Sequence, residues 1–179
     1  MLKIYNAFKT FSPNTPNAHT ALDGLNLNLD LGEFVTVVGS NGAGKSTIFN
    51  AICGNFLLDR GYITLDGKDI TFMKEHKRAA FIGRVFQDPM KGTAPNLTIE
   101  ENLALAYSRT RSGAFGKAVR KRDREFFAES LSEFGMGLED RMTTKVGLLS
   151  GGQRQVVTLL MCTIVTPKLL LLDEHTAAL

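Results

Sequence analysis

The sequence predicts an α/β fold with two side pieces, one rich in β-strands and one a helical insertion. Three observations predict it. Strands with alternating hydrophobicity lie near the N-terminus, an apolar strand then runs into a glycine-rich turn and a helix, and polar helical segments precede a second apolar strand. The length of 179 residues, with 44% hydrophobic and 22% charged residues, suits one domain with subdomains and excludes a disordered chain.

Composition also narrows the class of protein. Lys and Arg total 21 against 18 Asp and Glu, and a net charge of +3 is no evidence for nucleic-acid binding. Cys53 and Cys162 lack metal-type spacing and fit reduced thiols in the cytosol. The N-terminus lacks the apolar region of a signal peptide, and the run at 169–172 falls short of the roughly 18 residues of a membrane span. We therefore expect a soluble, cytoplasmic protein whose membrane role, if any, goes through a partner.

The first elements follow from periodicity. Residues 2–8 alternate and predict a strand, and residues 22–30 alternate again after a loop around Asn14 to Asn17, which predicts a half-buried antiparallel strand. Residues 34–38 are apolar on both faces and predict a buried parallel strand. A glycine-rich turn and a helix over 45–53 follow, and Gly54 is expected to stop this helix.

The next elements alternate between strand and helix. Residues 62–65 and 68–70 predict strands around an Asp66-Gly67 turn, and residues 81–86 predict another strand. A helix is expected from Ile99 to Tyr107, with Thr98 as N-cap and Glu101 at the capping-box position. Three further elements complete the chain: a polar helical stretch over 109–134, a helix from Ser150 to about Val165, and a second buried strand over 169–172.

A phosphate-binding loop is the strongest motif. Its residues match G-x-x-x-x-G-K-[ST]: Gly39, Ser40, Asn41, Gly42, Ala43, Gly44, Lys45 and Ser46. Glycines let the backbone N–H groups curl around an anion, and the helix that follows adds its positive end. Lys45 is expected to reach the β- and γ-phosphates, Ser46 to ligate Mg²⁺, and Thr47 to add a hydroxyl near the α-phosphate. The alternative is a glycine-rich turn without a ligand, but the flanking strand and helix favour phosphate.

Two acids follow the second apolar strand. Asp173 is expected to hold Mg²⁺ through water, and Glu174 to act as general base toward the attacking water. The alternative interpretation of such acids is a helix cap. The phosphate loop earlier in the chain favours the metal and base roles.

A second glycine-rich helix start follows the polar helical stretch. Ser150, Gly151, Gly152 and Gln153 combine an N-cap serine with two glycines, which predicts a second anion-binding helix end. One nucleotide site does not need two such ends, so the two ends are expected to have different uses.

The segment Leu149-Ser150-Gly151-Gly152-Gln153-Arg154-Gln155 resembles the signature sequence of ATP-binding cassette (ABC) ATPases. With the phosphate loop, Gln87 and residues 169–174, the resemblance covers essentially the whole chain in the expected order. It implies a P-loop NTPase fold of the ABC type that uses ATP and Mg²⁺. Residues 1–87 and 164–179 would form the nucleotide core and its β subdomain, and residues 88–163 the helical subdomain.

The resemblance also implies roles for single residues. Phe11 sits where the family keeps an aromatic that stacks on adenine, although Tyr5 or Phe8 could take this role. Gln87 would touch Mg²⁺ and the water, and the segment after it, to about Asn96, would sense a membrane partner. The catalytic set would be Glu174, Gln87 and Lys45. The signature residues Ser150, Gly151, Gly152 and Gln153 would contact the ATP bound by a second subunit in a head-to-tail dimer.

The resemblance implies the ATP-hydrolysing subunit of an ABC transporter, and it favours a bacterial importer over an exporter. Such a subunit lies in the cytoplasm at the inner face of the cell membrane, binds transmembrane permease subunits and serves a substrate-binding protein indirectly. The residues around Glu174 look like those of amino-acid uptake systems. Two alternatives stay open: a soluble ABC ATPase that acts on DNA or ribosomes, and a regulatory nucleotide-binding module without turnover.

The chain departs from the family pattern near its end. His175 stands where Pro or an Ala-like residue is usual, and the expected aspartate and switch histidine would lie beyond Leu179. We therefore expect a C-terminally incomplete copy whose last strand exposes apolar surface and which binds and hydrolyses ATP poorly. His175 itself is expected to be a loop residue.

Basic residues crowd one region of the predicted helical subdomain: Arg109, Arg111, Lys117, Arg120, Lys121, Arg122 and Arg124. A solvated helix face is one interpretation, and contact with lipid head groups or an acidic partner loop is the other. The phenylalanines nearby fit helix packing better than nucleic-acid stacking, so no nucleic acid is expected.

Overall fold

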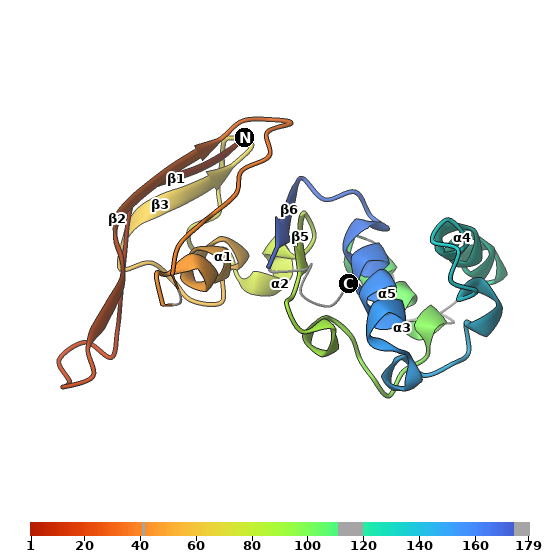
Figure 1. Ribbon diagram of the computed structural model, residues 1–179. Coiled ribbons are helices and arrows are strands. Elements are labelled where there is room, and N and C mark those ends of the chain that lie inside the picture. Colours follow the sequence, from red (N-terminus) through yellow and green to blue (C-terminus); the bar gives the residue numbers. More distant parts are fainter. Residues whose placement is uncertain (41, 111–119, 174–179) are drawn as a thin grey trace. The chain divides into compact units, whose positions relative to one another are not determined.

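The computed structural model describes residues 1–40, 42–110 and 120–173. It divides the chain into two compact units, Met1–Ala79 and Ala80–Leu179 (Figure 1). This division differs from the predicted subdomains, because the strand over residues 82–85 belongs to the second unit together with the helices. Each unit is described by itself below.

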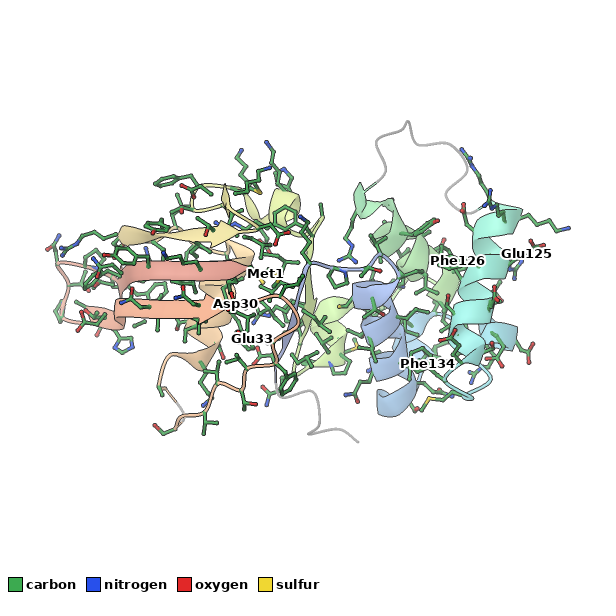
Figure 2. All side chains as sticks on the ribbon, turned by 90° about the horizontal axis from the view of Figure 1, so that it is seen from above. Met1, Asp30, Glu33, Glu125, Phe126 and Phe134 are labelled. Carbon is green, nitrogen blue, oxygen red and sulfur yellow. The ribbon has the colours of Figure 1, made fainter. Side chains whose placement is uncertain are left out.

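The first unit is built on a four-stranded antiparallel sheet in the order β2-β1-β3-β4 (Figure 1). Its strands are β1 (Leu2–Phe11), β2 (His19–Leu29), β3 (Arg60–Leu65) and β4 (Lys68–Asp69). Leu2 and Ile4 on β1 and Ile63 and Leu65 on β3 are buried, so one face of the sheet faces the core as the alternating pattern predicts. Beyond β2, the Glu33 carboxylate accepts a 2.7 Å hydrogen bond from the Asp30 amide and closes the next turn (Figure 2).

Helix α1 (Lys45–Cys53) has the predicted bounds and ends at Gly54, whose φ is 85°. The short helix α2 (Glu75–Arg78) supplies Arg78, a side chain only 1% exposed. Its guanidinium donates hydrogen bonds of 2.9 Å to the carbonyls of both Ala51 and Ile52 in the last turn of α1. Burial lowers the pKa of Arg78 from its ordinary value. These bonds anchor the C-terminal end of the helix that follows the phosphate loop.

The predicted buried strand at residues 34–38 is wrong. These residues form no strand in the described part of the chain, and the side chains of Phe34 and Val38 are 84% and 87% exposed. An apolar run becomes a buried strand only when neighbouring strands satisfy its backbone and cover both faces. Neither sheet of the described residues includes this segment.

The second unit contains the parallel pair β5 (Ile82–Val85) and β6 (Leu169–Leu172), in which Val85 lies opposite Leu172. Both strands match the predicted segments. Among the described residues β6 pairs only with β5, and Leu170 is 36% exposed. This agrees with the expectation that the last strand exposes apolar surface.

The described residues of the second unit also form the helices α3 (Ile99–Tyr107), α4 (Lys121–Ser132) and α5 (Gly151–Thr163). Short 3₁₀ turns lie at Pro89–Gly92, Ser108–Thr110, Glu139–Arg141 and Val146–Leu148. Figure 1 shows α3 beside α5, and their apolar faces share one core with α4. This core consists of Ile99, Leu103, Phe127, Leu131, Leu138, Met142, Val146, Leu149, Val156, Val157 and Leu160.

The helix starts confirm the local predictions. Thr98 and Glu101 form the predicted capping box of α3, in which the Glu101 carboxylate accepts a 2.7 Å bond from the Thr98 amide. Of the predicted helical stretch 109–134, α4 accounts for 121–132, and residues 111–119 lie outside the described part. Phe126 lies on α4 (Figure 2), and its ring centroid is 5.6 Å from that of Tyr107 on α3. No helix of the described residues has the length and hydropathy needed to cross a membrane.

Candidate nucleotide site

The phosphate loop of the first unit has the backbone shape that its glycines predict. Gly42 and Gly44 have φ values of 84° and 87°, and the Ala43 amide donates a 3.1 Å bond to the Ser40 carbonyl across the turn. A Cβ on Gly42 would meet nothing within 4 Å, whereas one on Gly44 would lie 3.0 Å from the Ala21 carbonyl oxygen. The loop is therefore open at Gly42 and closely packed on β2 at Gly44.

The start of α1 has no side-chain cap. Gly44 is the N-cap, and the first turn of the helix contains no acidic residue. The first N–H groups of a helix have no partner inside the helix, and the helix dipole favours negative charge there. Ser46 is exposed and Thr47 half-buried within this turn.

Lys45 is already directed at the loop. Its ammonium donates to the carbonyl oxygens of Gly39 at 2.6 Å and Ser40 at 3.0 Å. Both acceptors belong to the phosphate loop, so the ammonium lies over this loop, where a phosphate is expected. Of the predicted loop residues, only Asn41 lies outside the described residues.

The three candidate aromatics differ in their neighbours. Phe11 ends β1 opposite His19 of β2, and two residues along β2 the Ala21 carbonyl packs on Gly44 of the loop. Tyr5 instead stacks on Tyr62 at 5.3 Å. The third candidate, Phe8, lies under the guanidinium of Arg60, 4.9 Å from ring centroid to Cζ.

The sequence reasoning missed the neighbours that hold Phe11. Phe56 meets its ring edge-on at 5.2 Å, and the Lys9 ammonium lies 5.7 Å from the Phe11 centroid and 5.6 Å from that of Phe56. Asp59 accepts bonds from Lys9 Nζ at 2.8 Å and from the Thr10 amide at 2.7 Å. Those two hydrogen bonds lower the pKa of Asp59. Asp59 thus fixes the end of β1 that presents Phe11.

In the second unit, Asp173 follows β6 and its amide donates a 3.1 Å bond to the Val85 carbonyl at the end of β5. Gln87 is exposed two residues beyond Val85, so both predicted residues lie at the carboxyl end of the same parallel pair. The Asp173 carboxylate also accepts a 3.0 Å bond from Arg84 Nη2 on β5. Sequence reasoning missed Arg84, although an arginine between apolar strand residues is itself a sign of a buried partner.

The predicted magnesium ligands have suitable chemistry. Ser46 in the first unit, and Gln87 and Asp173 in the second, each offer a hard oxygen ligand of the kind that Mg²⁺ takes. The described residues contain no group of three His, Cys, Asp or Glu that could hold a metal ion.

The signature segment begins α5 with the predicted cap. The Ser150 hydroxyl accepts a 3.3 Å bond from the Gln153 amide, and the Gln153 side-chain oxygen accepts a 3.2 Å bond from the Ser150 amide. A Cβ on Gly151 or Gly152 would meet nothing within 4 Å, so the surface over the helix start is open. The Arg154 guanidinium bonds the carbonyls of Val146, Gly147 and Leu149 and holds the approach to the helix. Glu174 and His175 lie outside the described residues.

A phosphate loop before a helix, and a carboxylate at the end of a parallel strand, together define a P-loop nucleotide-binding protein. The sequence profile of the ABC transporter family matches residues 22–177. The chain belongs to this family of ATP-binding cassette ATPases.

Relatives and solved structures agree with this membership. A tyrosine transport ATP-binding protein of Clostridioides difficile (strain R20291) is 42% identical over 181 residues, which is all of this chain and 71% of that protein. A fructose import ATP-binding protein of Rhizobium meliloti is 38% identical over 89% of the chain, which spans 63% of that relative. A dimeric ATP-binding cassette in a post-hydrolysis state with ADP and Pi superposes on the whole chain with a TM-score of 0.84 at 31% identity, and 76% of that structure is covered.

Proposed function

We propose that the chain is the ATP-binding and ATP-hydrolysing part of an ABC importer subunit. The observation that carries the proposal is the open, uncapped start of α1, with Lys45 held over it by two loop carbonyls. Such a site suits a polyphosphate better than any neutral ligand.

The binding roles follow from this geometry. Backbone N–H groups from Gly42 to Thr47 bind the phosphates, the Lys45 ammonium binds the β- and γ-phosphates, and Phe11 stacks on the adenine. Phe56 and Asp59 support Phe11, as the contacts above indicate. Gly39, Ser40, Asn41 and Ala43 shape the loop.

The chemical step needs a cation, a positioned water and a base. Bound Mg²⁺ would neutralise the polyphosphate and stabilise charge on the transferred phosphoryl group. Ser46, Asp173 and Gln87 would hold it, Asp173 through water. Glu174 would accept the proton of the attacking water, and Gln87 would orient that water.

The signature residues serve a second copy. We infer that Ser150, Gly151, Gly152 and Gln153 contact the γ-phosphate bound by the partner in a head-to-tail homodimer. The open glycines at the start of α5 support this role, as do two dimeric structures of one similar cassette. Loss of the γ-phosphate removes the shared anion, so hydrolysis opens the dimer.

The transport context rests on the relatives. Transmembrane permease subunits would bind the segment from Gln87 to about Asn96 at the inner face of the cell membrane. A substrate-binding protein would act through those permeases. The buried Asn102 anchors this segment, because its amide exchanges bonds of 2.7 and 3.0 Å with the backbone of Ala94. The tyrosine transport relative supports an amino-acid-type substrate.

Nucleotide binding tests the proposal. Lys45→Ala should weaken binding of a fluorescent ATP analogue by about 100-fold, because a charge-assisted bond to phosphate contributes roughly 1.5–3 kcal/mol. Lys68→Ala, on the exposed strand β4, is the matched control and should bind as the natural chain does. Equal affinity for Lys45→Ala and the natural chain would contradict the proposed site.

A further inference from the structure

An ion pair occupies the strand end where the metal-binding carboxylate is expected. Arg84 Nη2 lies 3.0 Å from Asp173 Oδ2, and the two side chains are only 11% and 21% exposed. A charge pair this far removed from water is stable only when its geometry is good, and removing one partner leaves the other uncompensated. The pair is therefore part of the site rather than a surface contact.

The sheet itself holds both partners. Arg84 lies opposite Leu171 in the β5–β6 ladder, and the Asp173 amide bonds the Val85 carbonyl. The Arg84 guanidinium lies over the ring of Phe86, with Cζ 4.7 Å from the ring centroid. The backbone carbonyl of Arg84 accepts a 2.9 Å hydrogen bond from the buried Cys162 thiol. Backbone and ring contacts thus fix where the guanidinium charge stands.

A fixed positive charge beside a carboxylate has two opposite effects on a divalent cation. It orients the carboxylate, which favours binding, and it repels the cation, which disfavours binding. The Asp173 amide bond to β5 restrains the backbone of this residue whether or not Arg84 is present. The Arg84 guanidinium bonds the carboxylate oxygen Oδ2 and its charge repels a cation, so we expect removal of Arg84 to favour cation binding.

We propose that Arg84 serves as the resident counter-cation of Asp173, so that this carboxylate takes Mg²⁺ only together with a nucleotide polyphosphate. The inference rests on the proposed function, because it concerns the same metal. The Arg84 contact supports it, since a carboxylate neutralised by a guanidinium is a poor site for a free cation. The added negative charge of the phosphates then overcomes the repulsion.

The test measures Mn²⁺ binding without nucleotide, by the loss of the free-ion signal in electron paramagnetic resonance. The variants are Arg84→Met, which keeps a long apolar side chain over Phe86, and Arg84→Lys, which keeps the charge. Arg84→Met should bind Mn²⁺ about tenfold more tightly than the natural chain, because a nearby like charge is removed. Arg84→Lys should match the natural chain, and adding Asp173→Asn to Arg84→Met should abolish the gain.

Unchanged or weaker Mn²⁺ binding by Arg84→Met would overturn the proposal, as would a gain that survives Asp173→Asn. A damaged fold cannot produce tighter binding through Asp173. If Arg84→Met fails to fold by circular dichroism, Arg84→Gln takes its place with the same expected gain. ATP-analogue binding by the natural chain is measured alongside, because its failure would contradict the proposed function and leave the Mn²⁺ comparison intact.

Discussion

The two glycine-rich helix starts differ in how their backbone N–H groups are satisfied. Helix α1 begins at Gly44 in the left-handed conformation and has no side-chain cap. Helix α5 begins at Ser150 with a complete capping box. No side chain caps the backbone N–H groups at the start of α1, whereas Ser150 bonds one of those at the start of α5, over which the surface is open. The difference fits one end that surrounds a polyphosphate and one that meets it from outside.

The largest expected difference between the two helices concerns the arginines that hold them, Arg78 for α1 and Arg154 for α5. Arg78 is buried and bonds four carbonyls, two of them in the last turn of α1. Arg78→Met should lower the free energy of unfolding by about 3 kcal/mol, because these buried carbonyls lose charged donors. Arg154→Met, at the partly exposed approach to α5, should cost only about 1 kcal/mol.

Urea unfolding of both variants against the natural chain measures this difference. Equal costs at the two positions would mean that the phosphate-loop helix is not held more rigidly than the signature helix.

Replacing one glycine at each helix start, Gly44 at α1 and Gly152 at α5, should change stability in opposite directions. Gly44→Ala should cost about 1–2 kcal/mol in stability, because its φ is left-handed and the added Cβ would approach the Ala21 carbonyl. Gly152→Ala meets open space inside a helix and should stabilise the fold by about 0.5–1 kcal/mol. Thermal melting separates the two signs, and a destabilised Gly152→Ala would contradict the open surface.

Cap removal gives a smaller effect. Ser150→Ala should cost about 1 kcal/mol, and Thr98→Ala at the similar box of α3 should cost about the same. Only Ser150→Ala should also weaken ATP-dependent dimerisation, since Thr98 has no proposed contact with nucleotide. Sedimentation of both variants with ATP checks this. Equal loss of dimer in the two variants would mean that Ser150 only caps α5 and does not contact the nucleotide.

The smallest expected effect is the pH dependence of stability that Asp59 gives the first unit. Hydrogen bonds from Lys9 and Thr10 lower the pKa of Asp59 below its ordinary 3.8, so the ionised form favours the folded state. The stabilisation is present above the unfolded pKa and is lost as pH falls through the folded pKa. Melting temperatures of Asp59→Asn and the natural chain should differ at pH 7 and converge near pH 2.

Local signals predicted local structure well. Gly54, Thr98 and Ser150 end or begin their helices as expected, because capping depends on residues within one turn. The strand expected at 34–38 failed because burial depends on neighbours far along the chain. Arg84 and Asp173 are 89 residues apart, so their ion pair followed from no local pattern. The roles of the site residues stay predictions.

Sedimentation equilibrium of the Glu174→Gln variant, saturated with ATP and Mg²⁺, tests the central claim most directly. Without the base, the γ-phosphate persists and should hold two copies together between the phosphate loop of one and the signature helix of the other. The account predicts a dimer with ATP that dissociates with ADP. A variant that binds ATP yet sediments as a monomer at all concentrations would contradict it.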